Sequence, residues 1–169
     1  MKIYLYGSPI LEKKVAKVEN LPEDFEKIIR EMFNTMYDNS GIGLSANQVG
    51  LDMSFFITDI SVHDPHFSRR VFINPEIVAA EGESEMEEGC LSIPGIRSNV
   101  IRPEKIVLRY MTPEGDLKEE RFTDLMARVI QHETDHLNGI YFIDRISPLK
   151  RSFLSPKLKK LKEQALKEI

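Results

Sequence analysis

Two histidines, at positions 132 and 136, constrain this chain more than any other feature, because they lie inside a segment expected to be helical. Residues 123–137 carry apolar side chains at helical spacing. A separation of four residues places His132 and His136 one turn apart on one helix face, so both imidazoles can bind a single metal ion. Leu125 and Val129 share the face of His132 and are apolar. We therefore expect this face of the helix to pack against the rest of the fold.

Glu133 directly follows the first histidine and completes a His-Glu-Thr-Asp-His sequence. On a helix its side chain is offset by about 100° from that of His132, so it can approach an open coordination position without being a ligand. A glutamate in this arrangement is typical of the general base in a metal-dependent hydrolase. The alternative is a pair of helix-surface histidines beside a solvated glutamate.

The two histidines need a third protein ligand, because a catalytic site usually offers three ligands and leaves a position for water. One zinc-protease pattern continues through Gly139 to a third histidine, but this chain carries Phe142 there. A downstream carboxylate is a second possibility, with Glu163 and Glu168 as candidates in a Lys-rich segment. Cys90 is the third, although a lone cysteine can equally be a small buried hydrophobe. The residues alone leave these alternatives open.

Composition limits the classes of protein to which the chain can belong. Its 169 residues, 41% of them hydrophobic, suit one compact domain, so we expect residues 1–169 to form a single catalytic domain. A net charge of −4 gives no global positive field of the kind that draws proteins onto DNA. No apolar run approaches a membrane span, so no membrane partner is expected. Cys90 is the only cysteine, which excludes an intrachain disulfide and favours the reducing cytoplasm.

The pattern of elements predicts an α+β fold, in which antiparallel or mixed β-sheets pack around the central histidine helix. An N-terminal helix and a C-terminal amphipathic helix are expected at residues 20–37 and 155–168, the latter with Leu158, Leu161 and Leu166 on one side. Strand signals occupy residues 54–60 and 71–82, and residues 105–122 form the clearest hairpin. Residues 41–50 are expected to be a loop, and Gly139 a left-handed cap of the histidine helix.

Three short segments together resemble the peptide deformylase family. They are residues 41–48 (GIGLSANQ), 88–92 (EGCLS) and 131–139 (QHETDHLNG), in the order and at the separations that the family shows. The resemblance implies that Cys90 joins the two histidines as the third ligand of one divalent metal ion. It favours Fe(II), with Zn, Ni or Co as possible replacements. It also implies a substrate, the N-formylmethionine start of newly made peptides, and makes association with the ribosome plausible.

The resemblance assigns further roles in removal of the formyl group. Glu133 is implied as base and then acid, and the Gln48 side-chain amide and the Leu91 backbone N–H as donors to the oxyanion. From the residues themselves, Gly43 could let an extended peptide approach the loop backbone, or could simply belong to a helix exit loop. Arg97 and Arg102 could bind the carbonyls or carboxylate of the substrate, or form surface ion pairs.

Two positions depart from the family pattern. Ser45 replaces the usual alanine, which we expect to alter the packing of the loop and not the chemistry. Arg128 replaces an apolar residue near the side-chain pocket in many members, so we expect a more polar or more basic pocket rim. The candidates for an apolar methionine pocket are Ile42, Leu44, Leu125 and Val129.

Two rival functions use the same residues. A small zinc peptidase would combine the histidine pair and Glu133 with a downstream carboxylate, and its metal would survive loss of Cys90. A metal-sensing or ribosome-docking module would not need Glu133 or Gln48. Release of formate from a formyl-Met peptide separates both rivals from a deformylase.

Overall fold

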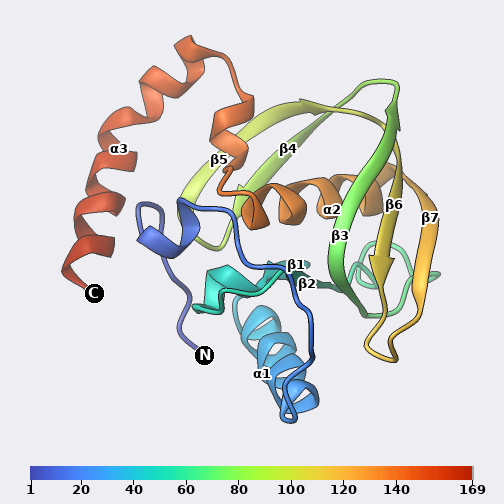
Figure 1. Ribbon diagram of the computed structural model, residues 1–169. Helices are drawn as coiled ribbons and strands as arrows, with labels where there is room; N and C mark the ends of the chain where they lie inside the picture. Colours follow the sequence, from blue (N-terminus) through green and yellow to red (C-terminus); the bar gives the residue numbers. More distant parts are fainter. Residues whose placement is uncertain (169) are drawn as a thin grey trace.

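The computed structural model describes residues 1–168, which form three α-helices and seven β-strands (Figure 1). The helices are α1 (Phe25–Asp38), α2 (Asp124–Leu137) and α3 (Pro148–Lys167). The strands are β1 (Gly43–Ser45), β2 (Phe55–Thr58), β3 (Arg70–Glu81), β4 (Ser84–Cys90), β5 (Ile93–Arg102), β6 (Lys105–Met111) and β7 (Leu117–Thr123). Three short 3-10 helices complete the described elements: η1 (Pro9–Leu11), η2 (Ala46–Val49) and η3 (Phe142–Arg145).

The strands form two antiparallel sheets. The larger sheet has the order β1-β2-β3-β6-β7, and β4 and β5 form a separate two-stranded hairpin. Figure 1 shows α2 running through the middle of the molecule, with the β4–β5 hairpin on one side and α1 on the other. The predicted α+β fold around a central histidine helix is therefore confirmed, and every strand pair in the described residues is antiparallel.

Helix α2 is buried along nearly its whole length. Its residues Met126, Ala127 and Ile130 pack on the large sheet in one hydrophobic cluster with Phe72 and Leu108. Every residue from 126 to 137 is buried, including the polar run from 131 to 136. Buried polar side chains are costly unless they are hydrogen-bonded or bind a ligand. The buried polar side chains of α2 therefore require hydrogen-bond partners within the core.

The ends of α2 follow the sequence closely. The helix begins directly after Thr123, although the Thr123 side chain makes no cap hydrogen bond. It is followed by Gly139, which has the expected left-handed conformation with φ of 75°. A Cβ at Gly139 would lie 3.0 Å from the backbone nitrogen of Lys13, so the turn also allows close approach of the N-terminal segment. No helix in residues 1–168 is long and apolar enough to cross a membrane.

The outer helices differ from the sequence prediction. Helix α1 starts at Phe25 and not at residue 20, because the residue before Pro22 is disfavoured in a helix. Helix α3 starts at Pro148 and not at residue 155, since the Ser147 side chain accepts a hydrogen bond from the Lys150 backbone N–H at 3.2 Å.

The buried side of α3 also differs in one position. Leu158 is buried and Leu161 packs beside it, but Leu166 is 53% exposed and Ala165 is buried instead. Ala165 follows Leu158 by seven residues, which is two helical turns, and therefore returns to the same face. The loop expected at residues 41–50 contains β1 and η2, because residues 43–45 pair with β2.

Candidate metal centre

Three side chains from two elements meet at one point beside α2. His132 and His136 come from the helix, and Cys90 comes from the end of β4. The cysteine sulfur and one nitrogen of each imidazole all lie within 4.8 Å of one another, with Cys90 Sγ 3.1 Å from His136 Nε2. A thiolate with two imidazoles suits a borderline divalent ion and is a poor set of ligands for calcium or magnesium. These residues therefore fit one transition-metal ion.

The direction of Cys90 follows from an irregularity in the hairpin. Gly89 pairs with Arg97 across the two strands, but Cys90 pairs with Ile93, so the register shifts between them. A β-bulge of this kind bends a strand and changes the direction of a side chain. At this position it accompanies the turn of Cys90 toward α2.

The alternative third ligands lie elsewhere. The ring of Phe142 stacks on His132 with centroids 6.0 Å apart, so this position provides packing. Glu163 lies exposed on α3, and Glu168 lies exposed directly after it and pairs with Lys2 at 3.5 Å. Cys90 is thus the third side chain placed with the two histidines.

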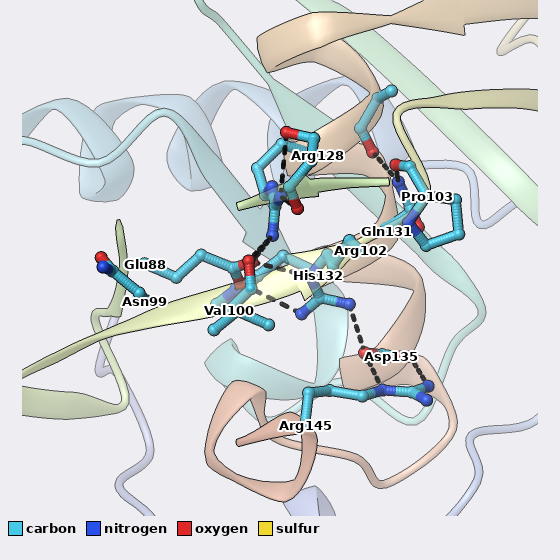
Figure 2. Close-up of polar contacts among 12 residues, drawn as sticks. Glu88, Asn99, Val100, Arg102, Pro103, Arg128, Gln131, His132, Asp135 and Arg145 are labelled. Atoms are coloured by element: carbon cyan, nitrogen blue, oxygen red, sulfur yellow. Dashed lines mark hydrogen bonds and ion pairs between the residues drawn. The ribbon is translucent and has the colours of Figure 1, made fainter. Parts of the chain in front are cut away.

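Glu88 orients the first histidine, as Figure 2 shows. Its Oε1 lies 2.8 Å from His132 Nδ1, which leaves Nε2 of that ring for an ion. Burial alone would favour the neutral form of Glu88, but hydrogen bonds from His132 and Arg102 hold its pKa well below the usual range. Glu88 is therefore an ionised acceptor. Sequence reasoning gave it no role, although it lies two residues before Cys90 in the same motif.

Arg102 also differs from the prediction in one respect. It is buried, donates to Glu88 Oε2 at 2.7 Å and donates to Asp135 Oδ2 at 2.8 Å. Asp135 in turn accepts two hydrogen bonds from Arg145 (Figure 2). Of its two expected roles, Arg102 therefore has that of an ion-pair partner, but the ion pairs are buried and not at the surface.

The Glu133 carboxyl group lacks a partner on one side. It is buried, and its Oε2 has no hydrogen-bond partner among the atoms of residues 1–168. Burial raises the pKa of Glu133 from 4.5 to about 7, so the group can exchange a proton near neutral pH. Burial also lowers the pKa of His136 well below its usual value, which keeps that imidazole in the neutral form that a metal requires.

The Gln48 side-chain amide has a fixed orientation. Its Oε1 accepts a hydrogen bond from the Ser45 backbone N–H at 3.0 Å and lies 3.0 Å from the Ser45 hydroxyl, which shares its one proton with Asn47 Oδ1 at 2.8 Å. Its Nε2 consequently points toward Ser92 Oγ at 3.0 Å and Cys90 Sγ at 3.5 Å. Ser45 therefore bonds directly to Gln48, which is more than the change in loop packing that we expected.

A cavity of about 780 Å³ opens in front of these groups. Gly43, Arg97 and Leu91 line it together with Glu133 and two of the three candidate ligands, Cys90 and His132. A Cβ at Gly43 would lie 2.8 Å from Glu133 Oε1, so the glycine makes room for the Glu133 carboxyl group. Arg97 is exposed and pairs with Glu87 at 2.7 Å.

The apolar part of the cavity differs in two respects from the predicted pocket. Ile42, Leu125 and Val129 line it, but Leu44 is completely buried in a separate core cluster. Arg128 lies in the cavity wall, where it is only 5% exposed and its guanidinium bonds to the β4–β5 hairpin. The expected basic rim is therefore replaced by a buried ion pair with Glu88.

Comparison with known proteins places this arrangement in a family. The family model described as polypeptide deformylase matches residues 1–152. A peptide deformylase of Pseudothermotoga lettingae is 42% identical over 98% of this chain and 94% of its own length, and one of Syntrophobacter fumaroxidans is 43% identical over 98% and 97%. The crystal structure of the peptide deformylase from Thermus thermophilus superposes with a TM-score of 0.88 at 38% identity, covering 96% of this chain and 98% of that one. The chain belongs to the polypeptide deformylase family.

Proposed function

We propose that this chain hydrolyses the formyl amide of N-formylmethionyl peptides and releases formate. The observation that carries the proposal is the meeting of Cys90, His132 and His136 beside the oriented Gln48 amide and the Glu133 carboxyl, whose Oε2 has no partner within residues 1–168. Gln48, Cys90, His132 and Glu133 border one cavity, and His136 contacts Cys90 at 3.1 Å. The whole chain would act as one catalytic domain in the cytoplasm.

The three ligands would hold one divalent ion. Such an ion supplies Lewis acidity, which polarises a carbonyl group and lowers the pKa of water. Ferrous iron is the ion that we favour, because the family resemblance implies it, and Zn, Ni or Co could replace it. The thiolate of Cys90 discriminates against calcium and magnesium.

Glu133 would move the proton in both halves of the reaction. It accepts a proton from the attacking water as the water oxygen bonds to the formyl carbon. The C–N bond then breaks, Glu133 gives the proton to the departing amine, and formate leaves with the free methionyl N-terminus as the second product. A pKa of about 7 suits a group that must first accept and then donate a proton.

Gln48 and Leu91 would stabilise the negative charge that develops on the formyl oxygen. The Gln48 Nε2 group is held in place by the bonds of its own Oε1 to Ser45, so it needs no reorientation during the reaction. The backbone N–H of Leu91 lies directly after Cys90 in the chain. Loss of one such donor costs about 3 kcal/mol of transition-state stabilisation.

The rest of the cavity would bind the peptide. Its apolar residues Ile42, Leu125 and Val129 suit an unbranched methionine side chain. The short strand that begins at Gly43 could pair with an extended peptide, and the exposed Arg97 could bind its carbonyl groups. Nascent chains are thus the proposed partners, and ribosome association is part of the same proposal.

Glu133→Ala provides the direct test. The variant should bind one equivalent of metal, because the three ligands are intact, and should release no formate from a formyl-Met tripeptide. Turnover at the wild-type rate would remove Glu133 from the mechanism. Cys90→Ser should lose the metal, whereas Glu163→Ala and Glu168→Ala should keep both metal and activity. A Cys90→Ser variant that retains stoichiometric metal would favour the rival peptidase.

A further inference from the structure

Arg128 connects the histidine helix to both strands of the hairpin that carries Cys90 (Figure 2). Its Nη1 donates to Glu88 Oε2 at 2.7 Å and to the Val100 carbonyl at 2.8 Å. Its Nη2 donates to the Ser84 carbonyl at 2.7 Å. A longer contact of 3.4 Å joins Nη2 to the Ser84 hydroxyl. One guanidinium on α2 thus makes three hydrogen bonds to β4 and one to β5.

Each oxygen of the Glu88 carboxylate has two hydrogen-bond partners. Its Oε1 faces His132 Nδ1 at 2.8 Å and Arg102 Nη2 at 3.0 Å. Its Oε2 accepts from Arg102 Nε and from Arg128 Nη1, each at 2.7 Å. Rotation of the carboxylate would break several charge-assisted hydrogen bonds at once. The His132 ring is therefore held by an acceptor that is itself held on both oxygens.

Arg102 cannot replace Arg128 in this arrangement. Its guanidinium is shared between Glu88 and Asp135, and Asp135 is shared in turn with Arg145. Glu88 is the only carboxylate that Arg128 contacts among the described ion pairs. Without Arg128, the only arginine bonded to Glu88 would be Arg102, which also bonds to Asp135. The second guanidinium therefore adds a restraint that the remaining network does not supply.

We infer that Arg128 is a positioning residue of the metal centre. It acts on His132 through Glu88 and on Cys90 through β4. It thereby fixes the distance between Cys90 on the hairpin and the two histidines on the helix. The inference goes beyond the proposed reaction but rests on the proposed metal site. Partners of this kind behind a ligand typically change metal affinity or activity by about 10–100-fold when they are removed.

The test measures release of metal and not turnover alone. Arg128→Met keeps an apolar chain of similar length in the cavity wall and removes all four hydrogen bonds. In the Co(II)-loaded protein we expect it to release cobalt to a chelator at least about tenfold faster than wild type, and to shift the visible absorption of the bound ion. Arg70→Met is the matched control, because Arg70 also forms a partly buried ion pair, with Glu120 at 2.6 Å, but in the large sheet. The control should lower the free energy of unfolding and leave cobalt release unchanged.

Each outcome is decisive. Cobalt release and absorption equal to wild type in Arg128→Met, with only a lower free energy of unfolding, would overturn the inference and leave Arg128 a structural residue. If that variant does not fold, Arg128→Lys takes its place, since an ammonium can donate to Glu88 but not reach both strands, and it should release cobalt at an intermediate rate. A release rate equal to wild type would again overturn the inference. A wild-type protein that binds no cobalt would instead overturn the proposed metal site.

Discussion

Gly43→Ala adds a single methyl group beside the Glu133 carboxyl group, the proposed acid and base. The new Cβ would lie 2.8 Å from Glu133 Oε1, 2.9 Å from Val129 Cγ1 and 3.1 Å from Glu133 Cγ. Gly43 has no left-handed backbone, so the substitution introduces a steric conflict and no dihedral strain. Both neighbours belong to the buried helix α2, and the carboxyl group is the part that can move. We therefore expect Glu133 to be displaced from its position.

The two effects have separate magnitudes. Overpacking of a buried site costs about 1–3 kcal/mol of unfolding free energy. A general acid and base contributes about 10²–10⁴-fold to rate, so its displacement should lower kcat/KM by at least about 100-fold. Metal content should stay at one equivalent, because the three atoms nearest to the new methyl group belong to Glu133 and Val129 and not to a proposed ligand.

Formate release from a formyl-Met tripeptide, urea unfolding and metal analysis on one preparation measure all three quantities. Gly115→Ala is the control, because Gly115 lies in the turn between β6 and β7 with no atom within 4 Å of a Cβ. Its φ of 91° predicts a loss of about 1 kcal/mol with unchanged activity. Wild-type activity and stability in Gly43→Ala would refute the steric argument.

Three further predictions concern the ion, the oxyanion donor and pH. Chelation should lower the midpoint of thermal unfolding, since an ion at 100 times its Kd stabilises the folded state by about 2.7 kcal/mol. The midpoint of Cys90→Ser should stay constant when cobalt is added at increasing concentrations. Ser45→Ala removes one of two donors to Gln48 Oε1, and should lower kcat about fivefold at unchanged KM, as about 1 kcal/mol per hydrogen bond implies. A wild-type kcat would contradict that role. In the metal-free protein the folded state holds the Glu133 proton more tightly than the unfolded chain, because burial raises that pKa from 4.5 to about 7. The unfolding free energy should therefore fall by about 3 kcal/mol between pH 4.5 and 7 relative to Glu133→Gln, and a constant difference in urea titrations across this range would exclude it.

The local signals in the sequence were sufficient for the histidine helix. Its apolar spacing, its start after Thr123 and the left-handed Gly139 are properties of neighbouring residues, and the structure matches all three. The position of Cys90 was different, because elimination left it as one of several third ligands. The family resemblance favoured Cys90, and in the structure its sulfur lies 3.1 Å from His136 Nε2.

Local sequence patterns did not predict the buried polar network that contacts the candidate ligands. Glu88 and Arg102 are 14 residues apart, and Arg102 and Asp135 are 33 residues apart. Periodicity indicates which residues are apolar, but it does not identify charged residues that become buried together. Strand β1 was missed for a related reason, since residues 43–45 become a strand only by pairing with β2.

The buried polar face of α2 has a consequence for attempts to improve the protein. Replacement of buried ionic groups by well-packed apolar residues is often neutral or stabilising. Loss of one partner from a buried ion pair is costly, so Arg128 and Asp135 are protected by their partners, whereas Glu133 forms no ion pair among residues 1–168. Glu133 would therefore be among the first positions to change in a library selected for heat resistance alone. Selection of that kind would raise the free energy of unfolding and remove a residue of the proposed active site. Substitutions on the exposed side of α3, where Leu149 and Phe153 face solvent, offer a route to stability that leaves the central helix intact.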